Sequence, residues 1–282
     1  MQTIGVLITC HNRKEKTIAC LRRLYAQDGL DSKFLLKTYL VDDGCTDGTG
    51  DAVRYLFPQV QILQGDGNLY WCGGMRMAFE RAMHDNSDFY LWLNDDVELN
   101  ARAVDILLNT YKAVAQSSPL QIIVGSTFDS DTGNHTYGGF VRYSRWNPFR
   151  CKPIIPHNFP IACDTFNGNC VLIHHSIKQI VGNLDKSFTH AIGDNDYGFR
   201  AIKIGCSIWV APSHVGVCNR NSYRWDNPIL SFKLRFENLF KVKGYSIKEM
   251  KIYTHRHGGI LWPIFWIIPV IRGLFFPKRI SL

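Results

Sequence analysis

Short runs of apolar residues alternate with longer segments of mixed polarity through the first half of the chain. Four of the runs are typical of buried parallel strands, because their apolar residues are continuous. They lie at residues 4–9, 34–41, 60–63 and 89–93. A helical pattern follows each of them, at residues 15–26, 50–56, 73–84 and 101–116. Strands that alternate with helices predict an α/β fold with a doubly wound, mostly parallel sheet.

All four predicted strands end in polar residues. The segments at these ends are TCHNR, DDGCTDG, QGDGN and NDD. Ligands of such sheets bind beyond the carboxyl ends of the strands, so the four segments predict one shared binding face. The first strand is not followed by G-x-G-x-x-G, and the chain has no G-x-x-x-x-G-K-[ST]. A dinucleotide dehydrogenase and a P-loop NTPase are therefore not expected.

Asp95 and Asp96 stand side by side after the fourth predicted strand. Neighbouring carboxylates repel each other, and burial makes both costlier to ionise. A bound divalent cation would offset that cost. The alternative is that the pair caps the helix that begins near Ala101.

The net charge of +8 is concentrated at one end of the chain. From Lys241 onward there are eight Lys or Arg residues and one acid, Glu249. This distribution argues against a nucleic-acid partner and predicts a basic patch. The nine cysteines include no C-x-x-C pair, which argues against a structural zinc site. Their odd number and the lack of a secretory leader predict a reducing, cytoplasmic compartment.

The order of the motifs resembles that of the family 2 glycosyltransferases, which have the GT-A fold. The order is VLITCHNR, VDDGCTDG, GNLYWCGGMRMAF, LWLNDDVEL, FNGNCVLIHHSIKQIVGNLDKSF and GDNDYGFRA, over roughly residues 3–220. NLYWCGGM is most similar to the branch that builds bacterial O-antigen and other surface polysaccharides, including rhamnosyltransferases. We expect a nucleotide-sugar-binding part at 1–125, an acceptor and catalytic-base part at 126–225, and a C-terminal amphipathic tail at 226–282.

The resemblance implies a donor site at the first two strand ends. Thr9, His11 and Asp43 would surround the pyrimidine base of a nucleotide-sugar; alternatively, His11 is a helix-entry residue. Arg13 and Arg76 would contact the diphosphate, or Arg13 is a solvated surface residue.

The NDD segment takes the place of the family's D-x-D motif, with Asn94 in place of the first acid. The resemblance implies that Asn94 and Asp95 contact the substrate, with Asp95 facing the ribose and sugar. It also implies that Asp96 ligates Mn²⁺ or Mg²⁺, which would neutralise the leaving diphosphate. His214 would complete the metal site, since imidazole suits Mn²⁺, or it is an ordinary loop histidine.

GDNDYGFRA lies where the family usually has a Glu-Asp pair at a helix start. Gly193 replaces the Glu, which leaves Asp194 as the general base for the acceptor hydroxyl, although the helix dipole would weaken its basicity. The alternative is that Asp194 and Asp196 cap the helix. Arg200 would pair with Asp196 at i,i+4. Asn167, in the FNGN segment, would bind the acceptor sugar, or it forms a turn.

Aromatic residues offer platforms for sugar faces. The candidates are Tyr70, Trp71 and Trp146, each of which is otherwise a core residue. Residues 129–160, rich in Gly, Pro and polar residues, predict loops or short hairpins near the acceptor.

Residues 258–279 are strongly apolar and are flanked by bases. Pro263, Pro269 and Arg272 leave an uninterrupted part shorter than the ~20 apolar residues of a spanning helix. The pattern predicts a segment lying on an anionic membrane surface. The alternatives are packing on the catalytic domain, a homodimer contact or a spanning anchor.

These features together predict an inverting, metal-dependent glycosyltransferase, peripheral on the inner face of a bacterial membrane. The donor would be dTDP-rhamnose or a UDP-sugar, and the acceptor a lipid-linked glycan. Two other functions stay open, a nucleotidyltransferase and a non-catalytic nucleotide-sugar or glycan-binding module. The departures at Asn94 and Gly193 keep the non-catalytic module open.

Overall fold

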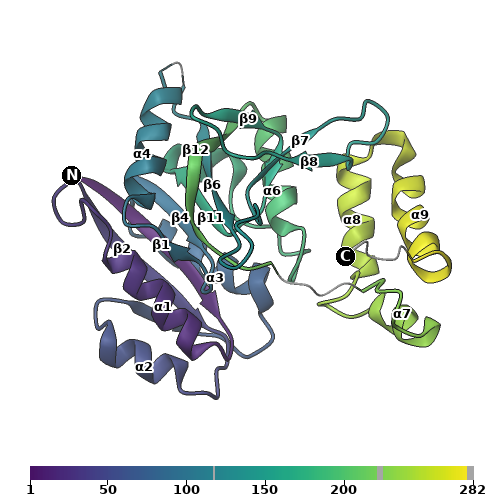
Figure 1. Cartoon of the computed structure of the whole chain (residues 1–282), viewed down its shortest axis with the longest axis horizontal. Coiled ribbons are helices and arrows are strands. Elements are labelled where there is room, and N and C mark those ends of the chain that lie inside the picture. The colour runs from purple at the N-terminus through teal and green to yellow at the C-terminus, as the bar shows by residue number, and fades with distance from the viewer. Residues whose placement is uncertain (117, 221–224, 278–282) are drawn as a thin grey trace.

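A mixed β-sheet forms the centre of the molecule in the computed structural model, which describes residues 1–116, 118–220 and 225–277. In this part of the chain the sheet has the order β3-β2-β1-β4-β11-β6-β12-β5, with β9 beside β12 (Figure 1). Its strands are β1 (Gln2–Cys10), β2 (Phe34–Asp42), β3 (Gln61–Gln64), β4 (Phe89–Leu93), β5 (Glu98–Leu99), β6 (Gln121–Phe128), β9 (Ile161–Cys163), β11 (Cys170–His174) and β12 (Ser207–Val217).

The first four strands run parallel, as their continuous apolar sequences predict. β11 is antiparallel to both of its neighbours, β4 and β6, and β12 pairs in parallel with β6. β4, β6 and β12 therefore point the same way, and the carboxyl ends of most strands meet at one edge. The α/β, mostly parallel sheet is confirmed.

Helices cover both faces of the sheet. One face carries α1 (Lys14–Tyr25), α2 (Thr49–Leu56) and α4 (Ala103–Val114), and the other carries α3 (Tyr70–Met83), α5 (His175–Val181) and α6 (Gly193–Lys203). Successive strand residues point to opposite faces, so Val6 of β1 packs under the first set and Leu7 under the second. The helices and strands predicted up to residue 116 are all present, with ends within three residues of those expected.

A small antiparallel sheet lies beside the main one. It has the order β10-β7-β8, with β7 (Gly139–Arg142), β8 (Cys151–Pro153) and β10 (Thr165–Phe166). β7 and β8 form a hairpin inside the segment predicted as loops or hairpins. Trp146, between them, is 83% exposed, so it is not a core residue.

The C-terminal region forms helices that stand against α6 (Figure 1). They are α7 (Phe232–Asn238), α8 (Ile247–His257), a 3₁₀ turn (Gly259–Leu261) and α9 (Trp262–Phe275). Tyr253 of α8 packs on Phe199 of α6, and α9 buries Val270 and Leu274 with Leu239. Within the described residues, no helix has the length and apolar character needed to cross a membrane. Residues 278 and 279 of the predicted interfacial segment lie outside the described residues.

Candidate active site

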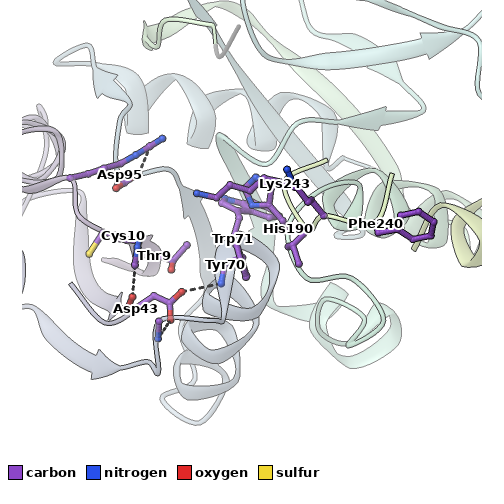
Figure 2. A pocket seen from close by; sticks show the side chains of 14 residues that line it. Thr9, Cys10, Asp43, Tyr70, Trp71, Asp95, His190, Phe240 and Lys243 are labelled. Atoms are coloured by element: carbon purple, nitrogen blue, oxygen red, sulfur yellow. Dashed lines mark hydrogen bonds and ion pairs between the residues drawn. The ribbon is translucent and has the colours of Figure 1, made fainter. Parts of the chain in front are cut away.

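A cavity of about 610 Å³ opens at the carboxyl ends of the parallel strands (Figure 2). Each of the four polar strand ends contributes to its wall. The lining residues are Thr9, Cys10, His11, Arg13, Asp43, Gly67, Tyr70, Trp71, Asp95, His190, Phe240, Lys241, Val242 and Lys243. The structure thus brings together the three residues predicted to surround a base, Thr9, His11 and Asp43.

The buried Asp43 carboxylate organises the loop between β3 and α3. Its oxygens accept hydrogen bonds from the backbone N–H groups of Gly67 at 2.9 Å, Leu69 at 3.2 Å and Tyr70 at 3.0 Å. The His11 ring is held by its Nδ1, which lies 2.6 Å from the Asp43 carbonyl oxygen. A carboxylate offers about four lone-pair positions, so Asp43 retains capacity for one further donor.

The two acids after β4 share one positive partner, Arg13. Its Nη1 donates to Asp95 Oδ1 at 3.2 Å and to Asp96 Oδ2 at 2.9 Å. Burial raises the pKa of Asp95 to about 6; Arg13 opposes this shift, and the charge of Asp96 adds to it. α4 begins at Ala103 with Arg102 at its N-cap position, so the interpretation of the acid pair as its cap is wrong.

Asp95 and Asp96 could bind a divalent cation whose other ligands are water and substrate phosphates. A buried carboxylate with a raised pKa gains from a nearby positive charge. Among the described residues, no three His, Cys, Asp or Glu side chains are grouped to hold a metal. Mg²⁺ commonly uses one or two carboxylates plus water and substrate phosphates, and the pair meets that requirement.

His214 lies on β12 beside another histidine. Its Nε2 is 3.3 Å from Nδ1 of His135, and its ring packs edge-on against Phe128. Asp96 has Cys218 as its neighbour from the end of β12, with the thiol 3.6 Å from Oδ1. The metal role of His214 stays a prediction, and these contacts do not support it.

Asp194 is the second residue of α6 and is held by three donors. Oδ2 accepts from the Gly168 N–H at 2.8 Å, and Oδ1 accepts from the N–H of Asn195 at 2.8 Å and from its Nδ2 at 3.2 Å. The N-cap position is Ile192, so Asp194 is not the N-cap residue. Burial raises the pKa of Asp194 against the opposing effect of these hydrogen bonds. This direction does not support the predicted weakening of the base, and the role of Asp194 stays a prediction.

Gly193 is explained by packing. A Cβ at this position would lie 2.5 Å from Cys72 Sγ and 3.3 Å from Phe188 Cβ. The side chain that the family usually has here would therefore collide with α3. Cys72 fills the space next to Asp194, and no acidic side chain stands at position 193.

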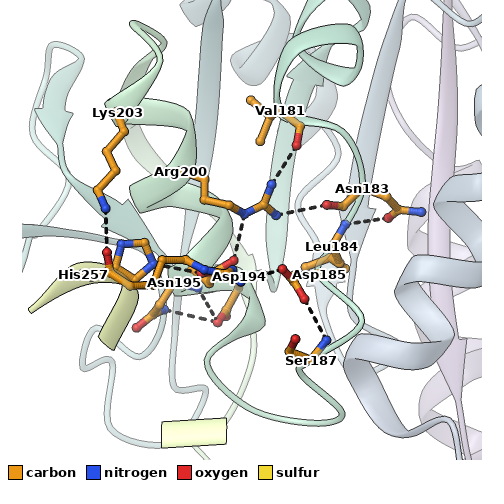
Figure 3. A network of polar contacts seen from close by, with 12 residues as sticks. Val181, Asn183, Leu184, Asp185, Ser187, Asp194, Asn195, Arg200, Lys203 and His257 are labelled. Carbon is orange, nitrogen blue, oxygen red and sulfur yellow. Dashed lines mark hydrogen bonds and ion pairs between the residues drawn. The ribbon is translucent and has the colours of Figure 1, made fainter. Parts of the chain in front are cut away.

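Asp196 is fully buried and ties α6 to α8. Figure 3 shows two of its partners, Arg200 and His257, in this network of polar contacts. Arg200 Nε donates to Oδ2 at 2.8 Å, as the i,i+4 spacing predicts, and Arg256 Nη1 and His257 Nε2 both lie 2.8 Å from Oδ1. We call these four residues the Asp196 cluster. Both carboxylate oxygens of Asp196 are engaged by these partners, which supports a structural role, and the N-cap position of α6 is Ile192.

Asn94 and Trp71 connect the segment after β4 to the start of α3 and to the segment before β11. The indole Nε1 donates to Asn94 Oδ1 at 2.7 Å, and the Asn94 backbone N–H donates to the Asn169 carbonyl at 2.9 Å. Trp71 lines the cavity with Tyr70, whereas its ring also packs on Trp92 of β4. Trp71 is therefore both a site residue and a packing residue.

Besides Asn94, two further predicted substrate contacts are absent from the described wall of the cavity. Arg76 Nη1 is buried without a hydrogen-bond partner, and its backbone carbonyl accepts from Asn183. The Asn167 N–H donates to the Gly138 carbonyl at 2.9 Å. Their roles stay predictions, and among the described residues neither lines the 610 Å³ cavity.

Five lining residues were not found from the motifs. His190 precedes α6, and Phe240, Lys241, Val242 and Lys243 come from the loop after α7. Burial lowers the pKa of His190, and the charges of Lys243 and Arg13 lower it further. Three cationic side chains thus surround the cavity. The signal for the lysines was present in the sequence, since the basic excess begins at Lys241.

Comparisons with known proteins agree with this geometry. The glycosyl transferase family 2 model matches residues 5–178. The N-acetylglucosaminyl-diphospho-decaprenol L-rhamnosyltransferases of two Mycobacterium tuberculosis strains are 25% identical over 218 residues, covering 69% of this chain and 70% of theirs.

Solved structures show the same fold at low identity. The mannosyltransferase PcManGT from Pyrobaculum calidifontis, in complex with GDP-Man and Mn²⁺, has a TM-score of 0.59 at 13% identity, covering 96% of this chain and 71% of its own. S. aureus TarS in complex with UDP has a TM-score of 0.56 at 11% identity, covering 90% and 70%. With the family match over more than half of its length, the chain belongs to glycosyl transferase family 2 and is a glycosyltransferase with the GT-A fold.

Proposed function

We propose that the enzyme is an inverting, metal-dependent glycosyltransferase that moves a sugar from a nucleoside-diphosphate sugar to a lipid-linked glycan in bacterial surface polysaccharide synthesis. One observation carries this proposal. Burial raises the pKa of Asp194, whose carboxylate accepts from the Gly168 N–H. Gly168 packs on Trp71, which lines the cavity and donates to Asn94 of the NDD segment. A direct displacement would need the base on the acceptor side of the sugar, and the position of Asp194 near Trp71 supports that role.

The cavity suits a nucleoside diphosphate. Thr9, His11 and Asp43 would hold the base, with the remaining Asp43 lone pair accepting its ring N–H. Arg13, Lys241 and Lys243 would face the diphosphate, since they are the cations on the cavity wall. The donor would be dTDP-rhamnose or a UDP-sugar, and the named rhamnosyltransferase relatives favour the former.

Asp96 would hold the divalent cation, with Asp95 close to the ribose and sugar. When bound, the cation would neutralise the charge that develops on the diphosphate. Mn²⁺ and Mg²⁺ both suit a site made of carboxylate, phosphate and water oxygens. The complex of PcManGT with Mn²⁺ supports a divalent metal in this fold.

The chemical step is a single displacement. The acceptor hydroxyl gives its proton to Asp194 while its oxygen forms the new bond to the anomeric carbon. The bond from that carbon to the phosphate oxygen breaks, its electron pair leaves with the diphosphate, and the configuration inverts. Because burial raises the pKa of Asp194, the carboxylate is a better proton acceptor than an exposed aspartate.

The exposed apolar faces of the C-terminal helices support a place on a membrane surface. The apolar residues from α7 onward that are more than a third exposed include Phe232, Phe236, Phe240, Ile260, Leu261, Ile264, Ile267, Ile268, Ile271, Phe275 and Phe276. Contiguous apolar surface of this kind marks an interaction site, and the basic residues from Lys241 onward add attraction to anionic lipid. The free state of all nine cysteines fits the cytoplasmic side of that membrane. A homodimer contact is the competing use of this surface.

Release of nucleoside diphosphate across a panel of activated sugars tests the proposal. dTDP-rhamnose, UDP-sugars and GDP-mannose would each be supplied with a lipid-linked N-acetylglucosamine acceptor, with Mn²⁺, Mg²⁺ or a chelator. We expect release from one donor that requires both acceptor and metal. Donor binding without release from any donor would favour a non-catalytic module, and transfer of a nucleotidyl group would favour a nucleotidyltransferase.

A further inference from the structure

Trp71 is fixed from two sides at the boundary between the cavity and the base. On one side its Nε1 donates to Asn94 Oδ1 at 2.7 Å. On the other side its ring lies on Gly168, where an added Cβ would come within 2.4 Å of two ring atoms. Only a glycine permits this contact, so the indole and the Gly168 backbone are packed without slack.

Gly168 passes this constraint to Asp194. Its N–H donates to Asp194 Oδ2 at 2.8 Å. This hydrogen bond fixes the carboxylate oxygen that does not accept from Asn195. The neighbouring Asn169 carbonyl accepts from the Asn94 backbone N–H at 2.9 Å. Asn94 is therefore connected to the Gly168–Asn169 segment in two ways, directly through its backbone N–H and indirectly through the Trp71 ring.

We propose that Asn94 is a positioning residue: through Trp71 and Gly168 it holds the Asp194 carboxylate in its place relative to the donor cavity. This inference deepens the proposed function and rests on Asp194 as its base. It also gives Asn94 a task other than contact with the substrate, because its side-chain oxygen accepts the indole N–H of Trp71.

Other titrating groups near Asp194 do not obscure its ionisation. Cys72 from α3 and Tyr253 from α8 both face it, and burial raises the pKa of each well above its ordinary value. Both therefore stay neutral while Asp194 titrates. The Asp196 cluster lies along α6, where Arg200, Arg256 and His257 contact Asp196.

The Gly168 amide gives a direct readout, because its N–H is bonded to the carboxylate that titrates. Its ¹H and ¹⁵N shifts would be followed against pH by NMR in the wild-type protein and in Asn94→Ala, Asn94→Asp and Trp71→Phe. Loss of a hydrogen bond to a carboxylate raises its pKa. In Asn94→Ala and Trp71→Phe the midpoint should rise by about 1 pH unit, and Asn94→Asp, which keeps an acceptor for the indole, should stay close to wild type.

Kinetics supply a second readout on the same variants. The acid limb of the kcat profile should move to higher pH in Asn94→Ala. We expect kcat to fall by about 10-fold, because a misplaced base loses part of the rate enhancement that a positioned base gives. The donor KM should change by less than about threefold, since less than 0.7 kcal/mol of binding is involved. Trp209→Phe is the matched control, because Trp209 Nε1 donates to Gln121 at 2.8 Å at the opposite edge of the sheet.

A Gly168 midpoint and a kcat profile in Asn94→Ala that match those of wild type and Trp209→Phe would overturn the proposal. Trp71→Phe gives the same test if Asn94→Ala does not fold. The titration needs no turnover. If the wild-type enzyme transfers no sugar while the Gly168 midpoint still separates Asn94→Ala from Asn94→Asp, the link from Asn94 to Asp194 stands and the proposed reaction fails.

Discussion

Arg13 Nη1 lies 2.9 Å from Asp96 and 3.2 Å from Asp95, so a single guanidinium bridges both acids of the NDD segment. A divalent cation entering at Asp96 would take over part of this neutralisation. Arg13, which lines the cavity, would then be free to turn toward the diphosphate of a donor bound there.

The first prediction follows from that arrangement. Asp96→Ala should abolish Mn²⁺-dependent donor binding, because the cation then loses its protein ligand and the diphosphate meets only Arg13 and the lysines. Titration calorimetry with and without Mn²⁺ measures the effect. Asp51→Ala is the control, since that acid is 88% exposed and pairs with Arg54 on the surface. The metal role fails if Asp96→Ala retains the Mn²⁺ dependence of the wild type.

Asp194→Asn is the second prediction. The amide cannot take the acceptor's proton, so transfer should fall by about 10²–10⁴-fold. An amide also cannot accept from both Gly168 and Asn195, because one of its two ends is a donor. We therefore expect a lower melting temperature, from a loss of about 1–3 kcal/mol. Transfer is measured at saturating donor, with donor affinity as control. Near wild-type transfer would remove Asp194 from the mechanism.

The third prediction concerns acid stability. Burial lowers the pKa of His174 to about 4 from 6.5, with His175 adding to the effect. The unfolded chain thus binds a proton at this position that the folded chain does not, and stability is lost as pH falls below 6.5. His174→Asn keeps an acceptor for the Ser176 N–H at the start of α5.

Urea unfolding of both proteins at several pH values gives the comparison. As pH falls from 6.5 toward 4, the unfolding free energy of His174→Asn should rise relative to that of the wild type. Asp95, with its raised pKa, acts in the opposite direction in both proteins and cancels in the difference. A difference that does not change with pH would contradict the prediction.

The fourth prediction tests the membrane surface without disturbing its support. Ile267→Ser with Ile271→Ser changes two exposed residues of α9 and leaves the buried Val270 and Leu274 in place. The variant should co-sediment less with vesicles of anionic lipid, and binding of both proteins should weaken with salt.

Ile180→Ser with Ile204→Ser is the matched control, because these residues are 48% and 47% exposed but lie at α5 and the end of α6. Equal co-sedimentation of the wild type, the α9 variant and the control variant would contradict the prediction that the exposed face of α9 binds the membrane. A change in sedimentation coefficient without a change in vesicle binding would instead identify a homodimer contact.

The fold of the first half of the chain could be predicted because its pattern is local. A buried parallel strand such as Phe89–Leu93 is apolar along its whole length. By contrast, β10 has two residues, too few to show a period. β11 is an apolar run like the others, and nothing in such a run shows that it pairs antiparallel.

The candidate site divides in the same way. Thr9, Asp43 and Asp95 follow strands, so their shared edge was predictable from the alternation of strands and helices. Lys243 lies between α7 and α8 and lines the cavity with the strand ends, a relationship between distant segments. The raised pKa of Asp194 depends on burial by neighbours that no motif describes.

The Asp196 cluster limits where this enzyme can be divided. Two of its members, Arg256 and His257, belong to the C-terminal helices, whereas Asp196 stands two residues from the proposed base. A fragment ending at residue 225 would keep every motif of the family and leave Asp196 with Arg200 as its one remaining partner in the cluster. Removing partners from a buried charge is strongly destabilising. We therefore expect the C-terminal helices to be required for a stable fold, and an exchange of these helices between relatives would have to move Arg256 and His257 together with Asp196.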